Sequence, residues 1–184
     1  MIPVSNHTIR VAGLIRELPL LEVAPNTQIA ILNILGDTEL VHAASRELSD
    51  LLLYSHPEVI VVPAVKSILL GYAISVQTGL PYVVLTKTYK PYMGNSLSAE
   101  VISITTGRPQ TLYLSEPDRS MIKGKRVALV DDVISTGSTL KAMEEIMTKA
   151  HANVVVRGAV FTEGDEHVWR DNVVALGHLP IFRK

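Results

Sequence analysis

The chain has 184 residues, of which 47% are hydrophobic and 19% charged, and its formal net charge at pH 7 is −1. This composition indicates one compact soluble domain spanning residues 1–184, and the near-neutral charge disfavours a nucleic-acid binder that relies on bulk charge. Without cysteine, the chain forms neither disulfides nor thiolate metal sites. No apolar run reaches the roughly 20 residues of a membrane span, and the N-terminus lacks signal-peptide regions, so a cytoplasmic protein is expected.

The chain alternates between short apolar runs and helical patterns. Strands are predicted at residues 27–35, 59–65, 82–87, 126–130 and 153–161. Helices are predicted after the capping residue Asp37, over about 67–78 with Gly79 just past the end, and over 138–150. Strands and helices that alternate at this spacing form βαβ units. The sequence therefore predicts an α/β fold with a central, mostly parallel sheet flanked by helices.

Residues 88–112 interrupt this alternation. They contain Gly, Asn, Ser and Pro, and their stretch SAEVISITT alternates weakly between apolar and polar residues. We therefore predict a loop that carries a hairpin. A connection of this length is long for an α/β fold, and such loops are usually functional. Glu100 is the only acid in the loop, and we expect it to be exposed.

The stretch VALVDDVISTGSTL, residues 127–140, holds the strongest chemical pattern. An apolar strand ends in Asp131 and Asp132, and a short loop then leads into a helix start, where unpaired amides and the helix dipole favour an anion. The loop residues suited to a phosphate are Ser135, Thr136, Gly137, Ser138 and Thr139. The acidic pair would repel a phosphate, so it suits a sugar diol or Mg²⁺ bound through water. Together these groups describe a site for ribose 5-phosphate.

Two other phosphate-binding patterns are absent from the sequence. No lysine follows the loop as in a Walker motif, and no dinucleotide-binding G-x-G-x-x-G occurs. Instead, VALVDDVISTGST resembles the phosphoribosyl-pyrophosphate (PRPP) signature of the type I phosphoribosyltransferases. Over residues from about 9 to 182, the chain resembles the adenine/xanthine branch of the purine enzymes, including the segments RVAGLIRELPL, KTYKPYM and KGKRVALVDDVISTG.

This resemblance implies roles for the acidic pair and the loop. Asp131 and Asp132 would be the catalytic-site acids that hold the ribose 2′ and 3′ hydroxyls, and they would bind Mg²⁺ through water. Ser135 to Thr139 would bind the 5′-phosphate of PRPP.

The resemblance also implies a pyrophosphate site. Its residues would be Val65, Lys66, Ser67, Lys87 and Lys90. Here the sequence departs from the adenine-enzyme pattern, since Ala64 stands where an acid is expected and Ser67 where a glycine is expected. The alternative interpretation is a plain strand–helix turn with a solvated lysine.

The family places its base-binding hood at the chain ends, here about 1–26 and 161–184, and its flexible lid at about 88–112. Phe161 would stack on a purine, although ordinary core packing is an equal alternative for this side chain. Glu163 would accept a hydrogen bond from an exocyclic amine or ring N–H, which favours adenine over xanthine.

The function implied is transfer of ribose 5-phosphate from PRPP to a purine base, most readily adenine, in a homodimer with Mg²⁺. A transferase for xanthine, hypoxanthine, guanine or orotate is an alternative. Another is a non-catalytic PRPP-sensing regulator. Such regulators carry an added N-terminal winged-helix domain, for which we expect no room here.

Overall fold

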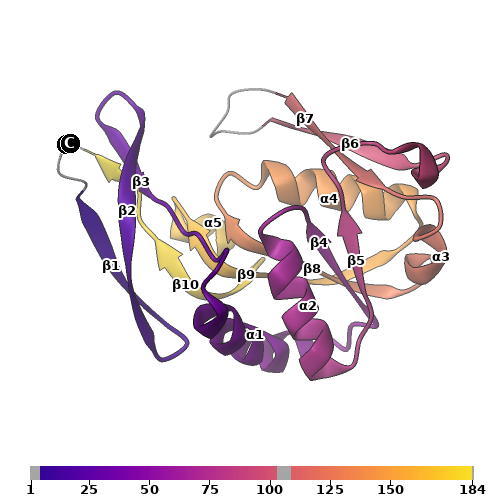
Figure 1. The fold of residues 1–184 in the computed structure, drawn as a ribbon, viewed down its shortest axis with the longest axis horizontal. Coiled ribbons are helices and arrows are strands. Elements are labelled where there is room, and N and C mark those ends of the chain that lie inside the picture. Colours follow the sequence, from indigo (N-terminus) through magenta and orange to yellow (C-terminus); the bar gives the residue numbers. More distant parts are fainter. Residues whose placement is uncertain (1–4, 103–108, 184) are drawn as a thin grey trace.

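A computed structural model describes residues 5–102 and 109–183 (Figure 1). The strands are β1 (Asn6–Val11), β2 (Leu14–Ala24), β3 (Thr27–Ala30), β4 (Val59–Pro63), β5 (Tyr82–Leu85), β6 (Leu97–Ile102), β7 (Pro109–Leu114), β8 (Arg126–Ile134), β9 (Asn153–Glu163), β10 (Val174–Leu179) and β11 (Phe182–Arg183). The helices are α1 (Thr38–Leu53), α2 (Ser67–Thr78), α3 (Arg119–Ile122), α4 (Ser138–Lys149), α5 (Glu166–Trp169) and the 3₁₀ turn η1 (Pro91–Met93). Within the described part of the chain, every helix is too short or too polar to span a membrane.

The central sheet has the strand order β10-β9-β8-β4-β5, and every neighbouring pair in it is parallel. The α/β fold and its flanking helices are therefore confirmed. From β4 the chain winds through α2 to β5, and from β8 it winds through α4 to β9 in the opposite direction. The order of the strands thus reverses between β4 and β8. In sheets of this kind, ligands bind beyond the carboxyl ends of the strands at such a reversal.

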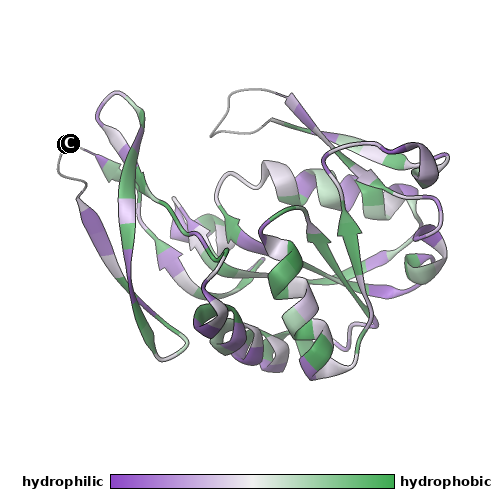
Figure 2. Cartoon of the chain, viewed as in Figure 1, coloured by the Kyte–Doolittle hydropathy of each residue, from purple (hydrophilic) through white to green (hydrophobic). Residues whose placement is uncertain are grey.

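The central strands are apolar because both of their faces are covered (Figure 2). All five residues of β4 are buried. Ile60 and Val62 belong to the hydrophobic cluster that includes residues of α1 and α2, whereas Val59 and Val61 belong to a second cluster that includes residues of α4. Successive side chains of a strand point to opposite faces. This two-sided burial explains the continuous β-branched run in the sequence.

The predicted helix ends are confirmed where a cap defines them. The carboxylate of Asp37 accepts a hydrogen bond from the Leu40 amide at 3.0 Å and so caps α1. Gly79 follows α2 with φ of 73°, the left-handed conformation that favours glycine.

Two strand boundaries differ from the prediction by four residues or more. β3 ends at Ala30, not at residue 35. The ladder between β2 and β3 stops there because Pro19 accepts the Ile31 amide at 2.9 Å but has no N–H to return. β8 continues to Ile134, beyond the predicted residue 130, because β9 is long enough to pair with it.

A second, four-stranded sheet has the order β1-β2-β3-β11 and lies to one side of the central sheet (Figure 1). Its N-terminal part extends past the expected hood boundary at residue 26, since β3 continues to Ala30. From the C-terminal segment only β11 joins it. β10 and the end of β9 belong to the central sheet instead.

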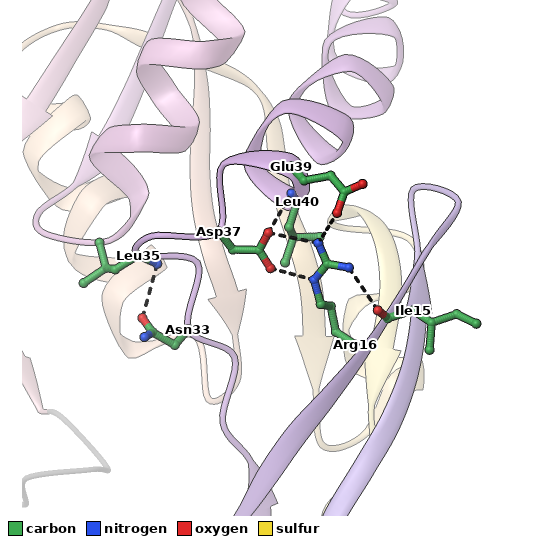
Figure 3. Close-up of polar contacts among 7 residues, drawn as sticks. All are labelled: Ile15, Arg16, Asn33, Leu35, Asp37, Glu39 and Leu40. Carbon is green, nitrogen blue, oxygen red and sulfur yellow. Dashed lines mark hydrogen bonds and ion pairs between the residues drawn. The ribbon is translucent and has the colours of Figure 1, made fainter.

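Arg16 of β2 joins this second sheet to α1 (Figure 3). Its Nε donates to Asp37 Oδ2 at 2.6 Å, and one terminal nitrogen donates to Asp37 Oδ1 at 3.0 Å and to Glu39 Oε2 at 2.8 Å. Because two nitrogens of the Arg16 guanidinium bond both carboxylate oxygens of Asp37, the contact fixes the orientation of the two groups as well as their distance. The Arg16 guanidinium lowers the pKa of Asp37, while the two carboxylates raise the pKa of Arg16.

We expect Arg16→Gln to lower the melting temperature at pH 7 and to raise amide exchange in β1 and β2. The pKa of Asp37 is depressed below its ordinary value of 3.8, so the pair contributes stability above that value and loses it as pH falls through the folded pKa. The difference from the wild type should therefore shrink as the pH falls below 3.8. Calorimetry over this range measures it, and a constant difference would contradict the role.

The predicted hairpin is confirmed within residues 88–112, where β6 and β7 pair antiparallel. This segment is therefore not an open loop over its whole length. Its residues Ala99, Val101 and Leu112 are buried in the cluster that includes residues of α4. Glu100 is exposed, as expected. Residues 103–108 lie outside the described residues, and the lid expected over about 88–112 stays a prediction.

Candidate functional site

A pocket of about 540 Å³ opens at the strand-order reversal, beyond the carboxyl ends of β4 and β8. Three segments form most of its wall: residues 29–35, the turn 63–67 and the stretch 131–140. Lys87, Val101, Gln110 and Glu163 complete the lining. The fold thus brings the acidic pair, the phosphate-type loop and the turn after β4 together in one cavity, as their positions at strand ends predicted.

The acidic pair is held by the turn after β4. The Ser67 hydroxyl donates to Asp131 Oδ1 at 2.6 Å, and the Asp132 amide donates back to Ser67 Oγ at 3.0 Å. The ammonium of Lys66 lies 3.6 Å from Asp132 Oδ2 and donates to the carbonyl of Leu32 at 2.8 Å. Ser67, which departs from the expected family pattern, and Lys66 therefore both contact the acidic pair.

Burial and the neighbouring Asp132 raise the pKa of Asp131 to about 8. The Ser67 hydrogen bond opposes this shift but does not cancel it. Two adjacent carboxylates in one pocket repel each other, and the site lowers that cost by keeping a proton on one of them. A ligand that needs both acids ionised, such as a diol or a cation, must displace that proton.

We expect Asp131→Asn to raise the melting temperature of the ligand-free protein more at about pH 9 than at about pH 5. The folded protein keeps the Asp131 proton to about pH 8, whereas the unfolded chain releases it near 3.8. Between these values the folded state binds more protons, so wild-type stability falls as pH rises, and asparagine removes that loss. A gain of about 1 kcal/mol would appear as about 2–4 °C. A pH-independent difference in calorimetry would contradict the assignment.

The phosphate-type loop leads into α4 through Gly137. This residue has φ of 76°, and the first helical residue is Ser138. The hydroxyls of Thr136 and Ser138 lie 2.8 Å apart at the pocket wall. The first-turn amides of α4 have no intrahelical acceptor, so they and the hydroxyls are suited to an anion. All five predicted residues, Ser135 to Thr139, line the pocket.

Trp169 of α5 covers this loop from the outside. A Cβ placed on Gly137 would lie 2.6 Å from Cη2 of Trp169, so only glycine fits between them. The indole Nε1 donates to the carbonyl of Glu163 at 3.3 Å, which fixes the ring. The sequence analysis did not assign Trp169 to the site, because nothing local to EHVW indicates which loop it packs against.

The predicted pyrophosphate residues divide into two groups. Val65, Lys66, Ser67 and Lys87 line the pocket, and the peptide bond between Ala64 and Val65 is cis. Lys90 is not among the lining residues, so its contact with pyrophosphate stays a prediction. η1 begins at Pro91, and the Lys90 amide contacts Met93 Sδ at 3.2 Å.

The two predicted base-binding residues also separate. Phe161 is 2% exposed and packs in the core under Gly177, where an added Cβ would lie 2.6 Å from its ring. The prediction that it stacks on a base is therefore wrong in this structure, and the core alternative holds. Glu163 lines the pocket but accepts the hydroxyl of Ser135 at 2.5 Å. Burial raises the pKa of Glu163.

Sequence reasoning missed the apolar wall. Its residues are Ile29, Ala30, Ile31, Leu32 and Leu35, from β3 and the connection to α1. The sequence did contain a signal for this wall. The apolar run 27–35 continues past the end of β3 at Ala30, so its remaining residues must pack against or line another part of the molecule. These residues add apolar lining to a pocket whose other segments are polar, as is usual for small-molecule sites.

The donor set fits Mg²⁺ only together with a substrate. In the described residues, no three His, Asp or Glu side chains are grouped to hold a metal. Mg²⁺ in proteins is bound by one or two carboxylates, substrate phosphates and retained waters. Asp131 and Asp132 supply the two carboxylates on this pattern.

Comparison with known sequences gives the family. The phosphoribosyl transferase domain model matches residues 30–173. The chain is 26% identical to the purine biosynthesis transcriptional repressor PurR of Bacillus subtilis, over 84% of this chain and 54% of the repressor. It is 31% identical to adenine phosphoribosyltransferase of Lactobacillus johnsonii, over 70% of this chain and 69% of that enzyme.

Other relatives are matched over less of their length. A hypoxanthine/guanine phosphoribosyltransferase of Methanocorpusculum labreanum is 34% identical over 52% of this chain and 48% of that enzyme. The chain thus spans about half the length of both this enzyme and the repressor.

Solved structures agree on the fold. Adenine phosphoribosyltransferase of Thermoanaerobacter pseudethanolicus superposes with a TM-score of 0.65 at 18% identity, over 95% of each chain. The Saccharomyces cerevisiae enzyme superposes with a TM-score of 0.64 at 19% identity, over 93% of this chain and 92% of that one. With a family model that covers most of its length and a fold that superposes almost end to end, the chain belongs to the phosphoribosyl transferase domain family.

Proposed function

We propose that the protein is a purine phosphoribosyltransferase, which transfers ribose 5-phosphate from PRPP to a purine base and releases pyrophosphate. The observation that supports this most is the shared pocket. One cavity contains two acids suited to a ribose diol, an anion loop at a helix start, two lysines and an apolar wall. These groups match the 5′-phosphate, ribose, pyrophosphate and base of the two substrates.

The residues would act mainly by positioning and charge. The 5′-phosphate would lie at residues 135–139 and the ribose hydroxyls at the acidic pair, so the anomeric carbon faces the apolar wall. Lys66 and Lys87 would stabilise the negative charge that develops on the leaving pyrophosphate. Mg²⁺ held with PRPP by Asp131 and Asp132 would neutralise further phosphate charge. The lid expected over about 88–112 would exclude water from the cationic sugar in the transition state.

Adenine is the base that we favour. Adenine enzymes are found among both the sequence relatives and the solved structures, and the Saccharomyces cerevisiae structure contains adenine. Glu163 adds an acceptor-only carboxylate at the wall, which would repel an anionic, xanthine-like base. Hypoxanthine and guanine remain alternatives, because relatives of that specificity match half of this chain.

A second candidate function is PRPP sensing without catalysis. The observation that favours it is the match to a transcriptional repressor over 84% of this chain. The acidic pair, already bound by Ser67 and Lys66, is also compatible with tight binding and slow chemistry. Both functions use the same PRPP site and differ only in turnover.

A base panel is the decisive experiment. Adenine, hypoxanthine, guanine, xanthine and orotate are each incubated with PRPP and Mg²⁺, and nucleotide formation is followed by chromatography. We expect adenine to be used best. If xanthine or hypoxanthine is used at least as well, the base assignment is wrong and the transferase stands. If no base reacts while calorimetry shows PRPP binding, the protein is a sensor.

A homodimer and a cytoplasmic location stay predictions. An apolar stripe on α2 is a feature that fits a dimer. Leu69, Tyr72 and Val76 recur at helical spacing and are 40%, 57% and 65% exposed in the single chain. Light scattering coupled to gel filtration gives the oligomeric state.

A further inference from the structure

Ser135 and Glu163 form a hydrogen-bonded pair at the pocket wall. They come from the ends of neighbouring parallel strands, where Ile134 of β8 is paired with Thr162 of β9. Ser135 directly follows Ile134, and Glu163 directly follows Thr162, so the register places Ser135 and Glu163 side by side. The Ser135 hydroxyl donates to Glu163 Oε1 at 2.5 Å, and both residues line the pocket.

This contact is of the charge-assisted kind. A hydroxyl that donates to a carboxylate at about 2.5–2.7 Å forms a strong bond. Glu163 is only 5% exposed, and burying a carboxylate costs free energy unless it is well paired. A buried glutamate that lines a pocket and accepts one serine hydroxyl there is poorly explained by stability alone, since a glutamine would fill the same space without a charge.

The position of the pair relates it to the base. Ser135 is three residues beyond Asp132, at the start of the anion loop, and it faces the same cavity as the apolar wall 29–35. A base joined to a ribose on the acidic pair would therefore have its edge near Ser135. Glu163 Oε1 is already bonded to that hydroxyl, so we assign the direct contact with the base to Ser135.

Resting on the proposed transferase function, we propose that Ser135 and Glu163 form a proton relay for the purine ring N–H. As the ring nitrogen forms its bond to the anomeric carbon, the bond from that carbon to pyrophosphate breaks, and pyrophosphate takes the electron pair. The ring proton passes to Ser135 Oγ, while the hydroxyl proton of Ser135 passes to Glu163 Oε1. Glu163 then loses its proton to water after the products leave.

Ser135 is the catalytic residue of this relay, because it contacts the base. Glu163 acts through it: it orients the hydroxyl and receives the proton from it. Proton acceptors of this kind contribute about 10²–10⁴-fold to rate, most when their pKa lies near the working pH. Burial moves the pKa of Glu163 upward, in that direction.

Any pH dependence assigned to Glu163 must be distinguished from that of the other titratable groups around it. His178 of β10 faces it, with Nδ1 2.9 Å from the Thr162 hydroxyl and Nε2 3.1 Å from the Gly164 carbonyl. Asp131 and Asp132 of β8, and the pocket lysines Lys66 and Lys87, face the same cavity. α5 presents to Glu163 the indole of Trp169, which is uncharged.

The test uses Ser135→Ala, Ser135→Thr and Glu163→Gln in the full chain, with adenine and the other purine bases as substrates. We expect kcat to fall about 100-fold in Ser135→Ala and Glu163→Gln, and in Glu163→Gln the fall in kcat should exceed any change in KM for PRPP. Ser135→Thr keeps a hydroxyl and should restore most of kcat. The double variant should be no slower than either single one, because the two residues act as a unit.

The pH profile separates a relay from a structural pair. Wild-type kcat should fall as pH falls through the raised pKa of Glu163, because a protonated carboxyl cannot accept a proton. Glu163→Gln should lack this acidic limb of the pH profile, in which kcat falls with pH, and His178→Gln should retain it. If the wild type turns over a base and Glu163→Gln keeps both kcat and the limb, the relay is overturned while the transferase stands. A wild type that turns over no base overturns both.

Discussion

Replacing both Asp131 and Asp132 with asparagine is expected to reduce PRPP affinity by about 10²- to 10⁴-fold while the fold stays intact. Each lost hydrogen bond to a charged group costs about 1.5–3 kcal/mol, and the effects of two are taken to add. The fold should survive because an asparagine oxygen at 131 can still accept the Ser67 hydroxyl and the Asp132 amide, which now bond to Asp131 Oδ1.

Isothermal titration calorimetry with PRPP and Mg²⁺ measures the loss, and circular dichroism checks the fold. Glu58→Gln is a suitable control, because that carboxylate lies outside the pocket and pairs with Lys125 at 3.0 Å. It should leave PRPP affinity unchanged. An unchanged affinity in the asparagine double variant would show that the ribose assignment is wrong.

Gly137→Val is expected to abolish phosphate binding at the loop. Its φ of 76° is unfavourable for a β-branched residue, and such strain costs about 1–3 kcal/mol. In addition, the new Cβ would lie 2.6 Å from Cη2 of Trp169. The loop or the indole must then move, and the amides that are arranged for an anion lose their geometry.

Gly124→Val is the control that distinguishes the effect of backbone strain from a change in the phosphate loop. Gly124 has φ of 72°, and an added Cβ there meets nothing within 4 Å. It should therefore carry a similar backbone cost without touching the pocket. Titration with inorganic phosphate and with PRPP should show binding in Gly124→Val and none in Gly137→Val. If Gly137→Val binds both ligands as the wild type does, residues 135–139 are not the phosphate site.

The sequence was informative where one short segment decides the structure. The run VALVDD forms the apolar part of β8 and places two acids near its carboxyl end, and parallel strands bring their carboxyl ends to one edge. The capping bond from Asp37 and the left-handed Gly79 are equally local. Such features depend on neighbouring residues, so their spacing along the chain is enough to predict them.

Contacts between distant segments were not predictable in this way. Ser67 and Asp131 are 64 residues apart, and only the pairing of β4 with β8 brings them together. Phe161 and Glu163 lie on the same face of β9 by alternation, yet Phe161 packs beneath Gly177 while Glu163 reaches the pocket. Their surroundings differ because Glu163 is the last residue of β9 and Phe161 lies two residues earlier. Periodicity gives the face of a residue but not its distance from the end of the strand.

The packing of Trp169 on Gly137 also makes the protein an optical reporter of its own ligand. Trp169 is the single tryptophan of the chain, so its emission is not mixed with that of another indole. An anion that occupies the loop changes the field and the mobility beside this ring. Titration of the native, unlabelled protein, read as a shift in its ultraviolet fluorescence, would therefore follow occupancy of the loop directly, in equilibrium or in a stopped-flow instrument, before any product is formed.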